Sequence, residues 1–305
     1  MIETKTFSFK NNIDEITNCD IYYNDDIYND DITQKKYPFV LLLHGFRAFS
    51  NWGFFPYFAT KLAENGFISG CLDFSLNTLL DRDKQLFDMG RFRKNTVTQM
   101  ITEAKMLIDN LQSNITSFAI DNFADRWNNE VYLIGHSLGG ALAIAVADSI
   151  NANNTNRDNI NANIIKKLVT ICSISDIDIY TIRQKEKWEE IGYKEFTDNN
   201  TGQNIILDVE FLRDRLTYIN EKSLAAMISR LNIPTYFIHT EADATVSPKS
   251  LDILSASFTN KKLLKTELVP KANHLLNCDH PFKETNIALS HIIDNVILWL
   301  KNSTL

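Results

Sequence analysis

One short motif in this chain has the residue types and spacing of a serine nucleophile. Residues 135–140 read Gly-His-Ser-Leu-Gly-Gly, which places Ser137 in a G-x-S-x-G pattern. In this pattern the serine occupies a sharp turn between a strand and a helix, where its hydroxyl is exposed for attack. Three of the 10 glycines in the chain fall within the motif. We therefore predict that Ser137 is a catalytic nucleophile.

The residues on either side of the motif predict the strand and the helix that such a turn requires. Residues 131–134 are β-branched, aromatic or aliphatic, as in a buried strand, and residues 141–147 read as a buried helix. The nucleophile is forced towards positive φ, so side chains close to it would crowd the turn. The glycines at 135, 139 and 140 avoid this crowding.

A serine hydroxyl is a weak nucleophile at neutral pH, so it needs a histidine base and an acid that orients the histidine. Asp243 follows the predicted strand 235–238, and His274 follows the predicted strand 266–269. In an open α/β sheet the site lies at the carboxyl ends of the strands. We therefore predict that both side chains meet Ser137 there.

Other side chains in the same part of the chain are alternatives for these roles. Asp176 or Asp178 follows the predicted strand 167–172 and could replace Asp243 as the acid. His239 stands four residues before Asp243 and is predicted to be structural. The order serine, aspartate, histidine along the chain favours Asp243.

The oxyanion formed by attack on a carbonyl needs preorganised donors, usually two backbone N–H groups. Leu138 directly follows the serine and is predicted to supply one. The second is predicted from Phe46, in the turn His44-Gly45-Phe46 after the apolar strand 39–43. His44 is predicted to brace this turn as a buried histidine, without a role in proton transfer.

These motifs together resemble the α/β-hydrolase superfamily, and the resemblance covers nearly all of the chain. Within it the chain is similar to the bacterial dienelactone-hydrolase-like and acyl-esterase groups, whose H-G-F turn and W-G-F-F-P segment match residues 44–46 and 52–56. Two positions depart from these groups. Dienelactone hydrolases proper have cysteine in place of Ser137, and the usual H-G-x-x-D has Thr240 in place of glycine. The resemblance implies a serine hydrolase, and we expect no cofactor.

The pattern of the whole chain predicts the α/β class, with a mostly parallel eight-stranded sheet and helices on both faces. An antiparallel hairpin comes first, and strands then alternate with helices. At 305 residues we expect one domain, 1–305. The predicted strands are 4–10, 16–23, 39–43, 67–74, 131–134, 167–172, 235–238 and 266–269, and the predicted helices include 57–65, 95–111 and 286–300.

Two segments interrupt this alternation. Residues 176–231 are too long for an ordinary connection and contain aromatic residues among charged ones, which predicts a small helical cap. Trp188 and Phe211 are predicted to line a substrate pocket beneath it, the alternative being that they only pack the cap. Residues 151–163 are rich in asparagine and predict a solvated surface excursion.

Composition excludes several other classes of protein. Hydrophobic residues make up 44% and charged residues 23%, which is ordinary for a globular protein, and the net charge of −7 argues against nucleic-acid partners. The 4 cysteines are widely spaced and show neither zinc spacing nor a disulfide pattern, so we expect no metal site. No run is long and apolar enough for a membrane helix, and the N-terminus has no apolar leader core. We expect a cytoplasmic enzyme unless a leader has been removed.

The function that these residues favour is hydrolysis of a small or medium carboxylic ester through an acyl-enzyme intermediate, as in a carboxylesterase. The same side chains could serve a lipase, a thioesterase, a serine peptidase or an acyltransferase. A non-catalytic ligand-binding protein on the same fold is a more distant alternative. The acyl group, the leaving group and the oligomeric state stay open at this stage.

Overall fold

The structure, a computed structural model, describes residues 1–28, 35–113, 120, 123–152, 164–198 and 201–302. The strands of its central sheet are β1 (Ile2–Lys10), β2 (Ile16–Asn24), β3 (Tyr37–Leu43), β4 (Ile68–Asp73), β7 (Trp127–His136), β8 (Ile165–Ile171), β11 (Thr235–Thr240) and β12 (Leu264–Val269). They lie in the order β1-β2-β4-β3-β7-β8-β11-β12. The pairs β1–β2 and β2–β4 are antiparallel and the other pairs are parallel. The predicted mostly parallel eight-stranded sheet is confirmed.

Helices cover both faces of this sheet because the central strands are apolar on both sides. In β3, Phe39 and Leu41 belong to one hydrophobic cluster, while Val40 and Leu42 belong to another on the opposite face. The first cluster includes side chains of α4 (Val97–Ser113), α6 (Leu138–Ala152), α9 (Leu224–Arg230) and α10 (Lys249–Ser257), and the second includes α2 (Phe55–Glu64) and α11 (Ile287–Lys301). Shorter helices are α1 (Asp25–Tyr28), α5 (Phe123–Arg126), η1 (Ser75–Asn77), η3 (Asn220–Lys222) and η4 (Lys261–Leu263).

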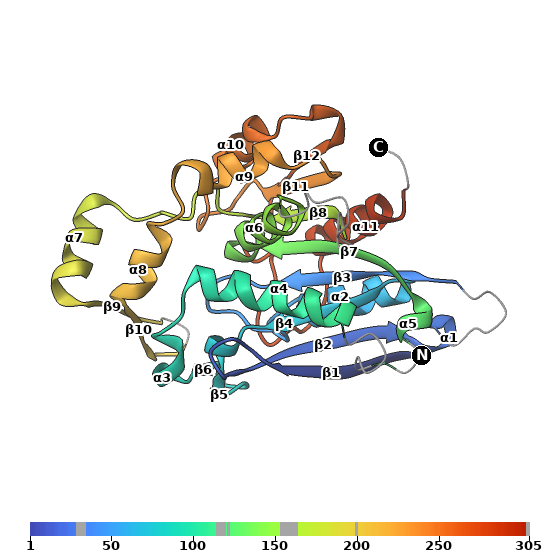
Figure 1. Ribbon diagram of the computed structural model, residues 1–305, viewed down its shortest axis with the longest axis horizontal. Helices are drawn as coiled ribbons and strands as arrows, with labels where there is room; N and C mark the ends of the chain where they lie inside the picture. The colour runs from blue at the N-terminus through green and yellow to red at the C-terminus, as the bar shows by residue number, and fades with distance from the viewer. Residues whose placement is uncertain (29–34, 114–119, 121–122, 153–163, 199–200, 303–305) are drawn as a thin grey trace.

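A side lobe extends from the end of the sheet towards which β3 and β7 point (Figure 1). We use this name for α7 (Ile182–Ile191), β9 (Tyr193–Thr197), β10 (Asn204–Asp208) and α8 (Val209–Arg215). Thr181 caps α7 in a capping box with Gln184, and Gly192 ends it with φ 85°. Trp188 and Phe211 belong to the lobe's own apolar core.

The lobe differs from the predicted helical cap over residues 176–231. It contains the antiparallel pair β9–β10 between its two helices. The last part of the segment does not belong to the lobe, because Leu224 and Ile228 of α9 are buried in the main core beside α6. The lobe core also includes Phe87 and Phe92, from a segment with β5 (Leu79–Asp81), β6 (Leu86–Phe87) and α3 (Met89–Phe92) that the sequence patterns did not predict.

Two further sequence expectations meet the structure here. The predicted surface excursion at 151–163 lies outside the described residues except for its first two positions, which end α6. Among the helices that the structure describes, none has the length and apolar content needed to cross a bilayer.

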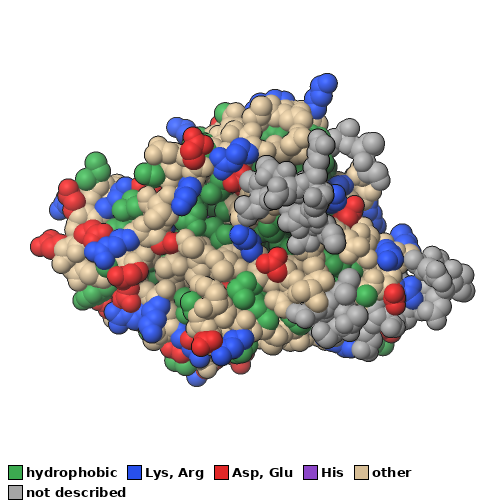
Figure 2. Space-filling model, in the orientation of Figure 1, with side chains coloured by type: hydrophobic (Ala, Val, Ile, Leu, Met, Phe, Trp, Pro, Cys, Tyr) green, Lys and Arg blue, Asp and Glu red, His purple; other side chains and the backbone are tan. Residues whose placement is uncertain are grey.

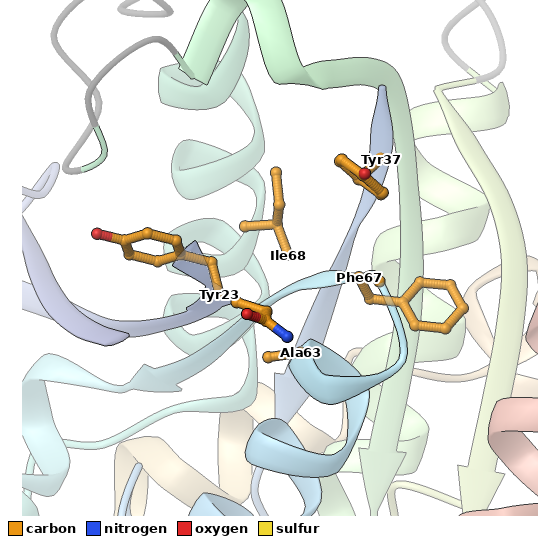
Figure 3. Close-up of a pocket in the computed structure, with 7 residues that line it drawn as sticks. Tyr23, Tyr37, Ala63, Phe67 and Ile68 are labelled. Atoms are coloured by element: carbon orange, nitrogen blue, oxygen red, sulfur yellow. The ribbon is translucent and has the colours of Figure 1, made fainter. Parts of the chain in front are cut away.

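A shallow hollow lies at the opposite end of the sheet from the side lobe. Its lining includes Tyr23, Tyr37, Phe67 and Ile68 (Figure 3). Tyr37 begins β3, whereas the predicted site follows the last residue of that strand, about 20 Å further along. The hollow is therefore separate from the predicted site.

Candidate active site

Ser137 occupies a sharp turn between β7 and α6. Its φ is 58°, in the left-handed region that a non-glycine residue rarely adopts. The backbone N–H of Ser137 donates to the carbonyl of Ile171 at the end of β8, 2.9 Å away. The turn thus holds the side chain at the carboxyl edge of the sheet, as the motif predicted.

The glycines after the serine let the helix pass close to neighbouring strands. A Cβ on Gly139 would stand 2.1 Å from the backbone oxygen of Leu43, and one on Gly140 would stand 2.6 Å from the side chain of Ser173. Both approaches are too close for any side chain, and the Leu43 oxygen belongs to a central strand that cannot yield.

Replacing Gly139 by alanine should therefore destabilise the protein by about 3 kcal/mol or more. Urea unfolding measures this directly. Gly90→Ala is the matched control, because a Cβ there meets only the movable carboxylate of Asp88, at 3.1 Å. Equal stability of the two variants would show that α6 does not approach β3 as closely as described.

Ser137, His274 and Asp243 form one hydrogen-bonded chain. Nε2 of His274 lies 2.9 Å from Oγ of Ser137, and Nδ1 lies 2.7 Å from Oδ2 of Asp243. Since a carboxylate only accepts, Nδ1 carries the proton and Nε2 is left free to accept from the serine hydroxyl. His274 and Asp243 are buried, and Ser137 is partly exposed.

The carboxylate of Asp243 is surrounded by donors. Oδ1 accepts the backbone N–H groups of Thr245 and Val246, both at 2.8 Å, and Oδ2 lies 3.3 Å from Nε2 of His239 besides His274. Burial by itself would raise the pKa of Asp243, but hydrogen bonds from His239, His274 and Val246 hold that pKa well below its usual range. The acid therefore stays ionised.

Two further histidines beside the chain are buried and neutral. Nε2 of His136 donates to the backbone carbonyl of His274 over 2.8 Å, which fixes the loop that carries the imidazole. Burial, with a smaller contribution from His274, lowers the pKa of His136 to about 3. Nδ1 of His44 donates to the carbonyl of Gly45, and burial lowers the pKa of His44 to about 4.

We expect the free energy of unfolding to fall when the pH is lowered from 7 to 5. The fold keeps His44 and His136 neutral, with pKa values of about 4 and about 3, whereas the unfolded chain binds their protons near pH 6.5. Their contribution is complete above pH 6.5 and is lost progressively as the pH falls towards the folded values. At pH 5 each of these two histidines should lower the free energy of unfolding by about 2 kcal/mol relative to pH 7. Urea unfolding at both pH values measures the difference.

The control for this pH dependence removes one ionisable ring at a time. His44→Gln cannot take up a proton there and should show a smaller loss between pH 7 and 5. His291→Gln, at a half-exposed side chain, should retain the wild-type loss. A wild-type protein that is equally stable at both pH values would contradict the prediction.

The turn after β3 lies directly against Ser137. A Cβ on Gly45 would stand 3.0 Å from Cβ of Ser137. The N–H of Phe46 makes no backbone hydrogen bond among the described residues. The N–H of Leu138 belongs to the first turn of α6, where helical amides have no partner within the helix. The two N–H groups predicted to bind an oxyanion thus lie in turns next to Ser137, and neither donates to a backbone carbonyl among the described residues.

Trp188 and Phe211, predicted to line the substrate pocket, lie in the core of the side lobe. They are 2% and 0% exposed, and Nε1 of Trp188 donates to the carbonyl of Leu207. The ring of Phe211 is 6.0 Å from that of Phe46, so the lobe packs against the turn after β3. Their contacts are packing contacts, and a role in binding substrate stays a prediction.

The alternative acids do not reach His274 in this structure. Asp178 forms an ion pair with Lys185, and Asp176 accepts the backbone N–H of Asp178. The contacts of His136 and His239 with the hydrogen-bonded chain were not foreseen. The middle position of the Gly-His-Ser motif was the available signal for His136.

Two groups of potential metal ligands overlap this chain. His136, Cys172 and His274, and likewise Cys172, His239 and Asp243, bring their ligand atoms within 4.8 Å of one another. The same imidazole and carboxylate atoms, however, hold the serine and orient the base. Burial raises the pKa of Cys172 to about 12, so its sulfur is a neutral thiol rather than a ligating thiolate. These atoms fit proton transfer better than metal binding.

Comparisons with known proteins agree with this architecture. The family model of class 3 lipases matches residues 73–183, which include the serine turn. A putative hydrolase from Agrobacterium vitis S4 has a TM-score of 0.70 and 15% identity, covering 99% of this chain and 100% of its own. Est1E from Butyrivibrio proteoclasticus with bound ferulic acid has a TM-score of 0.65 and 17% identity, and the match covers 96% of this chain and 97% of Est1E. Dienelactone hydrolase from Anabaena variabilis has a TM-score of 0.58 and 13% identity, and the match covers 98% of this chain and 97% of that enzyme.

The comparison with curated proteins gave no match. The sheet order, the turn at Ser137 and these structural neighbours together show the fold of the protein. The chain is an α/β-hydrolase in fold, as its motifs predicted.

Proposed function

We propose that this protein is a serine hydrolase that cleaves a small or medium carboxylic ester through an acyl-enzyme intermediate. The observation that carries the proposal is the chain Asp243, His274, Ser137, with separations of 2.7 and 2.9 Å. Each member has the geometry and protonation state that its role requires. The class 3 lipase match over residues 73–183 supports ester hydrolysis in general.

The mechanism follows from these contacts. Oγ of Ser137 attacks the ester carbonyl while Nε2 of His274 takes the hydroxyl proton, and the oxyanion accepts the N–H groups of Phe46 and Leu138. The imidazolium, stabilised by ionised Asp243, returns the proton to the leaving alcohol as its C–O bond breaks. Water then attacks the acyl-serine by the same route and releases the acid. His136 acts as a positioning residue through its bond to the His274 carbonyl.

A panel of p-nitrophenyl esters with acyl chains from two to sixteen carbons tests the proposal. We expect the highest kcat/KM at short or medium length. The lipase alternative is favoured by the family match and predicts activity that rises with chain length and at an emulsion surface. Thioester and aminoacyl amide substrates in the same assay test the thioesterase and peptidase alternatives, and transfer to an added alcohol tests the acyltransferase.

A non-catalytic binding protein would fail to react with a fluorophosphonate probe, so labelling of Ser137 separates it from every enzymatic alternative.

We further propose a cytoplasmic location. All four cysteines are free and buried thiols, which fits a reducing compartment.

A further inference from the structure

Several charged side chains of the side lobe form ion pairs at its surface. Figure 2 shows cationic and anionic side chains next to one another over the lobe at the left of the view. Arg213 pairs with Glu189, and Arg93 pairs with Asp208 across to the neighbouring segment. Four cations of the lobe have no carboxylate within ion-pair distance among the described residues: Arg183 and Lys187, which are exposed, Lys194, which is partly buried, and Arg215, which is buried.

Arg215 is the least expected of the four, because it is only 3% exposed. Its Nε donates to the carbonyl of Ile177 over 2.7 Å, while its two terminal nitrogens have no hydrogen-bond partner among the residues described. A buried guanidinium with unused donors is costly unless a ligand or water satisfies it. The side chain is thus equipped to take up an anion.

Lys194 and Arg215 face one aromatic ring. Nζ of Lys194 lies 4.3 Å from the ring centroid of Tyr180, and Cζ of Arg215 lies 5.5 Å from the same centroid. Lys194 shares the inward side of β9 with Phe196 and is partly buried. Burial and the charge of Arg215 both lower the pKa of Lys194, as expected for like charges held together without an acid.

The aspartates nearest to Arg215 do not neutralise it. Asp178 is engaged by Lys185, and Asp214 accepts a backbone N–H from α4. Asp176 accepts the backbone N–H of Asp178. Burial lowers the pKa of Arg215, and the charges of these three aspartates offset that effect only in part. None of them lies within ion-pair distance of the guanidinium, so an incoming carboxylate could still bind it directly.

The contacts of Arg215 connect it to the segments that follow the two strands beside Ser137. Ile177, which accepts its Nε, follows β8, and the ring of Phe211, 5.1 Å from Cζ of Arg215, lies 6.0 Å from the ring of Phe46, which follows β3. Strands β3 and β8 are the two neighbours of β7, whose end carries Ser137. Arg215 is therefore linked directly to the segment after β8 and, through Phe211, to the turn after β3.

We propose that Arg215 and Lys194 form a carboxylate-binding subsite, so that the preferred substrate is an ester bearing a carboxylate several carbons from the scissile bond. This inference rests on the proposed ester hydrolysis. Charge-assisted hydrogen bonds to a bidentate guanidinium are among the strongest in proteins. The lobe then selects the substrate, while the sheet edge performs the chemistry.

The test compares mono-p-nitrophenyl esters of glutaric, adipic and suberic acids with the same compounds capped as methyl esters. At the best of the three lengths, the wild type should hydrolyse the free acid with a kcat/KM at least 10-fold above that of its capped partner. In Arg215→Gln and Lys194→Met this ratio should fall to about one or below, with kcat/KM for p-nitrophenyl butyrate changed by less than about 3-fold. Arg213→Gln, an exposed arginine on the same helix, should keep the wild-type ratio.

Each outcome decides the proposal. If the wild type hydrolyses p-nitrophenyl butyrate but does not prefer any free acid over its capped partner, the subsite is wrong and the proposed ester hydrolysis is unaffected. The same conclusion follows if Arg213→Gln lowers the ratio of the two kcat/KM values as much as Arg215→Gln does. If no ester is hydrolysed, calorimetric titration of adipate into Ser137→Ala, and into Ser137→Ala with Arg215→Gln, decides the subsite alone. Binding by the first protein and none by the second supports it, and no binding by either refutes it. Lys194→Met provides the second arm should Arg215→Gln not fold.

Discussion

Replacement of Ser137 by alanine is expected to lower kcat for p-nitrophenyl butyrate by about 10⁶-fold. The hydroxyl removed is the one that lies 2.9 Å from Nε2 of His274, and no other group stands at that point to form the acyl-enzyme. The oxyanion donors and the ordered imidazole remain, so a small residual rate above the uncatalysed reaction is expected. Labelling by a fluorophosphonate probe should disappear with turnover.

Ser173→Ala is the matched control for this substitution. Ser173 lies beside the same turn, with its side chain against Gly140, but its hydroxyl donates to the carbonyl of Ile174 and not to His274. Activity within about 10-fold of the wild type is expected. Undiminished turnover by a folded Ser137→Ala protein, checked by its melting temperature, would rule out Ser137 as nucleophile.

Replacement of Asp243 by asparagine is expected to lower kcat by about 10⁴-fold with little change in shape. The amide oxygen will face the N–H groups of Thr245 and Val246, which leaves the NH₂ group towards His274. Nδ1 of His274 must then accept, so its proton moves to Nε2. An imidazole protonated at Nε2 cannot take the proton from the serine.

The rate of the Asp243→Asn protein should rise with pH more steeply than that of the wild type, because alkaline conditions ionise the serine without the help of a base. A pH profile of kcat from 6 to 10 measures this. Asp178→Asn is the control, since this rival acid pairs with Lys185 and does not contact His274. A larger loss in Asp178→Asn than in Asp243→Asn would reverse the assignment of the acid.

The central sheet and the serine turn could be predicted because their signals are local. The glycines at 135, 139 and 140 mark a turn in which Cβ atoms would collide, and the structure shows those collisions with Gly139, Leu43 and Ser173. Apolar runs such as Tyr37–Leu43 give strands buried on both faces without regard to what lies far away. The strand boundaries differ from the predicted ones by only a few residues.

The side lobe could not be predicted in the same way. Strand β9 reads Tyr-Lys-Glu-Phe-Thr, a charged sequence without a clear apolar period, and it forms a strand because β10 pairs with it over the lobe core. Phe87 and Phe92 join that core from a distant segment that carries no strong pattern. Arg215 has the composition of a surface residue, and only the packing of α8 against Ile177 and Phe46 buries it.

By itself the sequence determined the class of the sheet, the bend at Ser137, and the residue types of the proposed nucleophile, base and acid, because each depends on residues adjacent in the chain. Tertiary structure alone decided that His274 meets Ser137, and that His136 and His239 contact His274 and Asp243. Those contacts join positions up to 138 residues apart. Their geometry depends on how whole strands and loops pack, which no local pattern specifies.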